Sequence, residues 1–182
     1  MAVLSFRNFT RLDEQERDLV LTWRNSPRVR SMMTNREPIG KDDHLAFLTA
    51  LPNREDCRYF LFSVDGVPAG VLDFVKIDRE AKACEPGLYV GDERFLGMGV
   101  AVYFCALEYA FGTLGCDRVS CTVREENKTS HFICTRVFGA RETEVSDGFR
   151  RLVFDGAQWA SRKLALRDKM QRNLGMEDVL WQ

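Results

Sequence analysis

The sequence predicts a mixed α/β domain in which a central β-sheet is covered by helices. Three observations support this prediction. The chain has 182 residues, enough for one domain with a sizeable core. Helical periodicity dominates residues 13–51, whereas β-rich runs and strict alternation dominate residues 58–77 and 118–123. A short strand, a glycine-bearing turn and a long apolar helix follow one another over residues 87–114.

The first fifty residues are predicted to hold one strand and two or three helices. Residues 3–9 form the strand, and residues 13–25 form a helix that ends at Ser26-Pro27. Residues 28–33 and 41–51 are shorter helical stretches. The apolar side of the first helix comprises Leu12, Leu19, Val20 and Trp23.

The period changes to that of a sheet in the middle of the chain. Two β-rich runs, 58–64 and 67–77, are joined by Asp65-Gly66, which is a hairpin signal. The remaining expected elements are a strand at 87–91, a helix at 97–114, a strand at 118–123, a helix at 127–138, strands at 140–146 and 149–155, and a helix at 158–170. Residues 1–170 are therefore expected to form one domain, followed by a tail at 171–182.

Composition excludes several classes of protein. The net charge of −1, from 26 basic and 27 acidic residues, gives no reason to expect nucleic acid or a membrane surface as a partner. The N-terminus lacks a long apolar run, and the stretch 100–107 is too short to span a bilayer, so we expect a soluble cytoplasmic protein. Six cysteines and two histidines without a CxxC motif predict buried thiols rather than a metal site or disulfides.

The stretch RFLGMG, residues 94–99, places two glycines where a buried helix is about to begin. Glycines at a helix N-terminus let phosphates approach the backbone N–H groups, and Arg94 can add a charge-assisted contact. The Walker and dinucleotide-binding patterns both fail, because the residues they need after Gly99 are absent. A tight turn without a ligand stays an alternative. The expected phosphate-binding residues are Arg94, Phe95, Leu96, Gly97, Met98, Gly99 and Val100.

Arg94-x-x-Gly97-x-Gly99, with a strand before it and a helix after it, resembles the acetyl-CoA signature of the GCN5-related N-acetyltransferases (GNAT). The element order resembles that family over nearly the whole chain. The stretches LTWRNSPRVRSMM, HLAFL and CRYFLFSVDGVPAGVLDFVKID resemble the acetyltransferases of the pseudaminic-acid pathway. Ribosomal-protein N-terminal acetyltransferases carry a stretch similar to the first of these. The resemblance implies a GNAT fold with six to seven mostly antiparallel strands, splayed in the middle.

The resemblance also implies an activity. Acetyl-CoA would be the acetyl donor, no metal would be needed, and the acceptor would be the 4-amino group of UDP-4-amino-4,6-dideoxy-N-acetyl-altrosamine, attacking directly. Two alternatives stay open. One is the same chemistry on a protein N-terminus or another small amine, and the other is an acyl-CoA-binding module without catalysis. The oligomeric state is left open, a homodimer being one alternative.

Cofactor contacts beyond the glycine turn are implied by the resemblance. The pantetheine arm would pair with the backbone of Leu88, Tyr89 and Val90, and an N–H near Tyr89 or Val90 would stabilise the oxyanion. Asn127 matches a position that binds the pantetheine, although it is equally suited to cap a helix. The tyrosine that the family uses as general acid is absent, and the count gives Cys134 instead. Cys134 is either the proton donor or a small buried residue, in which case solvent supplies the proton.

Candidate residues on the acceptor side each have a plain structural alternative. Tyr89 would help acid–base chemistry or pack in the core, and Glu85 would act as a base through water or be merely solvated. His44 matches a substrate-side histidine, or it packs on its helix. The remaining candidates lie near the end of the first helix and just after it. Arg24 would hold a phosphate or be a C-terminal charge favoured by the helix dipole. Asn25 would line the acceptor cleft, and Met32 and Met33 would stack on uracil or fill the core.

Overall fold

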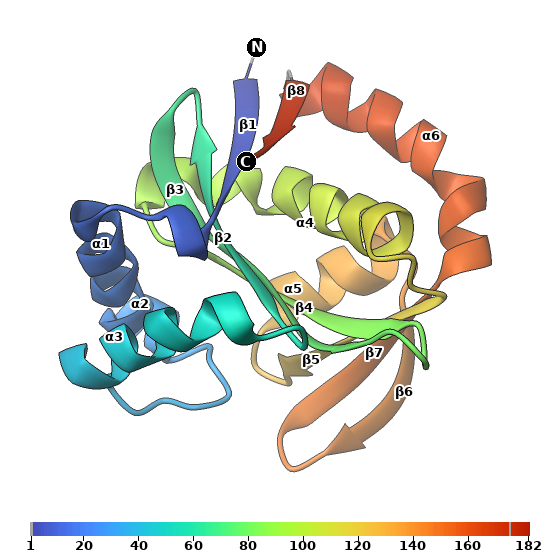
Figure 1. Ribbon diagram of the computed structural model, residues 1–182. Helices are drawn as coiled ribbons and strands as arrows, with labels where there is room; N and C mark the ends of the chain where they lie inside the picture. The colour runs from blue at the N-terminus through green and yellow to red at the C-terminus, as the bar shows by residue number, and fades with distance from the viewer. Residues whose placement is uncertain (1, 175) are drawn as a thin grey trace.

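An eight-stranded sheet with helices on both faces forms the centre of the computed structural model, which describes residues 2–174 and 176–182 (Figure 1). The strand order is β6-β7-β5-β4-β3-β2-β1-β8. The strands are β1 (Ala2–Asn8), β2 (Arg58–Val64), β3 (Val67–Asp78), β4 (Ala83–Val90), β5 (Arg118–Arg124), β6 (Arg141–Ser146), β7 (Phe149–Asp155) and β8 (Met176–Trp181).

Helices cover the two faces of the sheet unequally (Figure 1). The α-helices are α1 (Glu14–Asn25), α2 (Pro27–Arg30), α3 (Lys41–Ala50), α4 (Gly99–Glu108), α5 (Lys128–Phe132) and α6 (Gly156–Leu174). Short 3-10 turns are η1 (Phe9–Arg11), η2 (Leu51–Asn53) and η3 (Glu93–Met98), and π-helical turns are η4 (Tyr109–Thr113) and η5 (Ile133–Val137). Helices α1 to α3 gather on one face, and α4 crosses the other.

Local sequence explains where α1 and α2 begin. The side chains and backbones of Asp13 and Glu16 satisfy each other in a capping box at the start of α1. Ser26 then accepts a hydrogen bond from the N–H of Val29, and Pro27 occupies the first turn of α2. These caps make a sharp corner between α1 and α2, so that α2 turns toward the centre of the sheet.

The sheet is splayed between β4 and β5, as predicted. These strands are parallel and pair only at Ala83↔Arg118 and Cys84↔Val119. On its other edge β4 stays antiparallel to β3 as far as Gly70↔Val90. The far end of β4 therefore belongs to one half of the sheet, and the far end of β5 belongs to the half completed by β7 and β6.

Two apolar clusters lie on opposite faces of the sheet. The larger one surrounds α4, whose residues 101–107 are all buried. Burying each large apolar side chain stabilises the fold by about 1.5–3 kcal/mol. By length and composition the helical stretch Glu93–Thr113 could cross a membrane, but the core helix of a soluble protein passes the same test. The smaller cluster packs α1 and α3 against β2 and β3.

The structure differs from the predicted elements in two places. The helix expected at 97–114 begins at Gly99, because 3-10 turns occupy Glu93–Met98. Residues 171–182, expected to be a tail, instead extend α6 to Leu174 and add β8, which runs parallel to β1. The ring of Trp181 stacks on Phe6 with centroids 4.1 Å apart, so an aromatic contact secures this extra strand. The sheet consequently has eight strands rather than six to seven.

Candidate active site

A cleft of about 430 Å³ opens where β4 and β5 separate. Its walls come from α2 and the segment after it, the far ends of β4 and β5, the start of α4, and α5. Residues distant in the sequence therefore meet at the splay. The cleft has a cofactor side, formed by α4 and α5, and an acceptor side, formed by α2 and the segment 31–36.

The start of α4 leaves bare backbone at the cleft. Gly99 lines the cleft, and a β-carbon there would meet only Val90 Cγ2, at 3.9 Å. Within the described residues, no side chain caps this helix start, which follows the 3-10 turns of η3 directly. The backbone dipole adds partial positive charge at the same point. The fold itself does not need glycine at position 99, whereas a close-lying phosphate does.

The other residues of the glycine turn divide into two groups. Leu96 lines the cleft, whereas Phe95, Met98 and Val100 pack against the larger apolar cluster. Gly97 is not among the lining residues, and in the part of the chain that the structure describes a β-carbon there would have no neighbour within 4 Å. The steric case for glycine is thus stronger at Gly99 than at Gly97.

Arg94 is not among the residues that line the cleft. Its guanidinium makes a bidentate ion pair with Asp92, at 2.6 Å for the shortest contact, and its side chain is 70% exposed. The sequence missed Arg28, which lines the cleft and donates hydrogen bonds to the carbonyls of Val90 (2.9 Å) and Gly91 (2.7 Å). Arg28 thereby fastens α2 to the end of β4.

The splayed edge of β4 presents backbone to the cleft. Leu88, Tyr89 and Val90 all line it, and they are paired on their other edge with β3. Among the described residues, β5 gives no ladder partner beyond Cys84 on this edge. An extended chain with amide groups could therefore add to the edge, which is the place that the family resemblance implies for a pantetheine arm.

The floor of the cleft holds three polar side chains in apolar surroundings. Cys134 Sγ lies 4.0 Å from Cys121 Sγ, and both line the cleft with Tyr103. The contact with Cys121, together with burial, raises the pKa of Cys134, so it stays a neutral thiol and is a poor proton donor. The Tyr103 hydroxyl is buried and has no hydrogen-bond partner among the described residues. In the sequence, Tyr103 looks like one more residue of a long apolar helix.

The helix that begins after Asn127 changes its hydrogen-bond pattern at the cleft. The regular helix α5 passes directly into the π-helical turn Ile133–Val137, which contains Cys134. Such turns are rare and are frequently found at functional sites. Asn127 caps α5 by accepting from Ser130 N at 3.0 Å, and it also lines the cleft, so its two predicted roles are compatible.

The two acid–base candidates on β4 differ in position. Tyr89 lines the cleft, and its hydroxyl donates to the carbonyl of Val20 on α1 at 3.4 Å. Burial raises the pKa of Tyr89, so its proton stays in place at neutral pH. Glu85 does not line the cleft. Its carboxylate instead pairs with Lys76 at 2.8 Å and with Arg151 at 3.6 Å.

Three predicted acceptor residues lie behind the cleft wall rather than in it. Arg24 donates to Asn35 O at 2.8 Å, and its other terminal nitrogen is buried without a partner among the described residues. Asn25 exchanges hydrogen bonds with the backbone of Ile39. His44 packs between α3 and α1 with Nε2 3.1 Å from Arg17 O, and burial lowers its pKa. These contacts shape the connection between α2 and α3.

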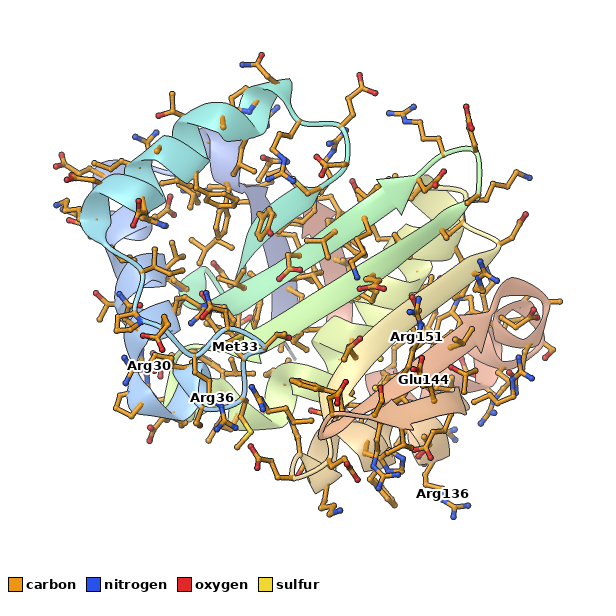
Figure 2. All side chains as sticks on the ribbon, turned by 90° about the horizontal axis from the view of Figure 1, so that it is seen from below. Arg30, Met33, Arg36, Arg136, Glu144 and Arg151 are labelled. Carbon is orange, nitrogen blue, oxygen red and sulfur yellow. The ribbon has the colours of Figure 1, made fainter. Side chains whose placement is uncertain are left out.

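The segment 31–36 lies across the cleft and is tied to β5. Met32 and Met33 line the cleft. Arg124, which sequence analysis missed, donates to the carbonyls of Met33 (2.8 and 3.0 Å) and Thr34 (3.2 Å), and Arg36 pairs with Glu126. Figure 2 shows Arg30, Met33 and Arg36 close together, whereas Arg151 and Glu144 lie toward the β6–β7 edge of the sheet. Isolated surface arginines gave no sequence signal for this bridge.

Comparisons with known proteins agree with this geometry. The family described as "Acetyltransferase (GNAT) domain" matches residues 4–137. Acetyltransferase PseH of Campylobacter jejuni is 33% identical over 126 residues, which are 69% of this chain and 78% of that protein.

Two solved structures are also similar. The Campylobacter jejuni N-acetyltransferase PseH in complex with acetyl coenzyme A has a TM-score of 0.69 and 26% identity, and the match covers 84% of this chain and 98% of that one. Spermidine N-acetyltransferase from Vibrio cholerae, in complex with CoA and spermine, has a TM-score of 0.74 at 17% identity, covering 86% of this chain and 98% of that one. At that identity the second likeness concerns the fold alone.

Proposed function

Because the chain belongs to the GNAT family of acetyltransferases, we propose that it acetylates the amino group of a nucleotide-linked amino sugar. The proposed acceptor is the 4-amino group of UDP-4-amino-4,6-dideoxy-N-acetyl-altrosamine. The acetyl donor is acetyl-CoA. We place the enzyme in the cytoplasm, where nucleotide sugar and acetyl-CoA would both be at hand, and we leave a homodimer as an expectation.

One observation carries this proposal. A single cleft contains both the start of α4 at Gly99 and the segment 31–36, which Arg124 ties to β5. The start of α4 at Gly99 suits the pyrophosphate of acetyl-CoA, and the edge of β4 suits its pantetheine arm. The acetyl thioester would then lie near the floor, between β4 and β5. An amine reaching it from the segment 31–36 would meet the carbonyl carbon without a covalent enzyme intermediate.

The chemistry needs little beyond positioning and a polarised carbonyl. Holding amine and thioester together accelerates the reaction, because their translational and rotational entropy is already lost when they bind. A backbone N–H of Tyr89 or Val90 would donate to the oxyanion as the nitrogen–carbon bond forms. The sulfur–carbon bond then breaks, and coenzyme A leaves. We assign no acid role to Cys134, since its neighbour and its burial raise its pKa.

The sugar nucleotide is supported by the acceptor side. Met32 is 46% exposed and Met33 lies beside it, so both are available to an apolar ring. The buried nitrogen of Arg24 behind them needs a partner, and a small movement of Asn35 would offer it to a phosphate. Resemblance to the pseudaminic-acid-pathway enzymes over the N-terminal half points to the same substrate class.

The test is release of free thiol from acetyl-CoA with a panel of acceptors. The panel contains UDP-4-amino-4,6-dideoxy-N-acetyl-altrosamine, a peptide with a free N-terminus, spermidine and no acceptor. We expect turnover with the sugar well above the other arms. Turnover with the peptide alone would overturn the sugar assignment in favour of a protein acceptor. Tight coenzyme A binding with no turnover on any amine would favour a non-catalytic binding module.

A further inference from the structure

A carboxylic acid that sequence analysis passed over lies beside the cleft, on β3. Asp73 is paired in register with Tyr59 on β2 and with Gly87 on β4. A β-carbon at Gly87 would lie 2.7 Å from both carboxylate oxygens of Asp73. The carboxylate therefore rests on the bare backbone of β4 at position 87. Gly87 itself lines the cleft, three residues past the last β4–β5 pair.

The carboxylate of Asp73 has no counter-ion among the described residues. Among the ion pairs of the described residues, none involves Asp73, and its neighbours on the same face are the phenols of Tyr59 and Tyr89. Arg24 on α1 approaches Tyr89 and donates to Asn35. Glu85, farther along β4, is held by Lys76 and Arg151. Burial raises the pKa of Asp73 to about 7, while a hydrogen bond from the backbone of Gly87 opposes the rise.

We propose that Asp73 is the general base that accepts the proton of the attacking amine through one water molecule held at Gly87. The inference rests on the proposed function. As the amine nitrogen bonds to the acetyl carbon, the carbonyl electron pair moves onto oxygen and gives a tetrahedral intermediate with a positively charged nitrogen. A proton of that nitrogen passes to the water, while the water gives a proton to Asp73. The carbonyl then re-forms, the sulfur–carbon bond breaks, and its electron pair leaves with coenzyme A as a thiolate. Solvent then removes the proton from Asp73 and protonates the thiolate.

Geometry favours Asp73 over the other candidate bases. Glu85 is engaged in ion pairs outside the cleft, and His44 is packed against α1. Tyr89 keeps its proton, and its hydroxyl donates a hydrogen bond to the carbonyl of Val20. Asp73 lies one strand from the splay, about 5 Å in sheet geometry, which is the span of one bridging water. A base that titrates near neutral pH is also the most effective one under cellular conditions.

The test compares Asp73→Asn, which keeps the shape of the side chain, with Asp78→Asn at the exposed end of the same strand. Steady-state rates are measured over about pH 5 to 9, with whichever acceptor of the panel the wild type acetylates best. In Asp73→Asn we expect kcat to fall by about 10²- to 10⁴-fold and the inflection near pH 7 to disappear, with unchanged affinity for acetyl-CoA. Asp78→Asn should behave as the wild type.

A second variant tests the cradle itself. Gly87→Ala places a methyl group where the carboxylate rests, so kcat should fall, and adding it to Asp73→Asn should cause little further loss. Asp73→Asn with a rate within about threefold of wild type, or with the same pH profile, overturns the proposal. A wild type that acetylates only the peptide or spermidine overturns the sugar assignment, and Asp73 is then judged on that acceptor. Absence of turnover with every amine overturns both.

Discussion

The two sides of the cleft are built in different ways. The cofactor side is mostly backbone from a continuous stretch: the edge of β4, the turns of η3 and the first turn of α4. The acceptor side is assembled from side chains on separate elements, including Arg28 on α2, Met33 after α2 and Arg124 on β5. A site made of contiguous backbone needs glycines at fixed spacing, which a sequence displays. A site made of converging side chains exists only after the chain has folded.

The largest expected effect concerns the free energy of unfolding and its dependence on Asp73, next to the acceptor side. The folded pKa of Asp73 is about 7, above the usual value of 3.8, so the native state favours the protonated form. Stability is therefore lost as the pH rises from about 4 to about 7, and Asp73→Asn should recover up to about 4 kcal/mol of unfolding free energy above pH 7. Urea unfolding at acidic and at alkaline pH measures this. Equal stabilities of variant and wild type at alkaline pH would show that the carboxylate is well solvated.

The next largest effect is expected on the affinity of the cofactor side for acetyl-CoA. Gly99→Val should weaken acetyl-CoA binding by about 100-fold, because the branched side chain would stand where the phosphates approach the helix N-terminus. The fold should tolerate it, since a β-carbon at Gly99 meets only Val90 Cγ2 at 3.9 Å. Titration calorimetry with coenzyme A and a thermal melt separate the two outcomes.

Gly97→Val is the matched control for that experiment, and a smaller loss is expected because Gly97 is not among the residues lining the cleft. Wild-type affinity in Gly99→Val would contradict the assignment of the phosphate site.

A smaller effect is expected from the bridge over the cleft. Arg124→Met removes the hydrogen bonds that hold the carbonyls of Met33 and Thr34, so the segment 31–36 should loosen. The KM for the amine acceptor should rise about tenfold, with little change for acetyl-CoA. Arg136→Met, on an exposed arginine well away from the bridge in Figure 2, serves as the control. A parallel rise in both KM values would show that Arg124 serves the cofactor as well.

The smallest effect is expected at Cys134. Its raised pKa makes it a weak acid, so Cys134→Ala should change kcat by less than about threefold. The affinity for acetyl-CoA should also be preserved, because the thiol occupies little of the cleft wall. A fall of tenfold or more in kcat, with the KM unchanged, would return the proton-donor role to Cys134.

The glycine turn could be predicted from the sequence because it depends on local pattern, and the fold family and the splay followed from the family resemblance that this turn carries. Asp73 was not found, since a polar residue that alternates with apolar ones in a strand looks like a solvent-facing position. Only the pairing with Gly87 places its carboxylate beside the cleft. For His44 the sequence left a substrate-side role and packing both open, for the converse reason. Its position on the apolar side of α3 indicated burial correctly, but the neighbour that buries it is α1.

The parallel pairing of β8 with β1 has a consequence for how the chain folds. Phe6 and Trp181 are joined across nearly the whole length of the sequence, and Gln182 exchanges backbone hydrogen bonds with Phe6 and Asn8. Contacts of such long sequence separation have a high loop-closure entropy, and they form slowly. We therefore expect β8 to dock late. Until it docks, β1 is an open sheet edge that can recruit a strand from another molecule, so refolding yield should fall steeply with protein concentration.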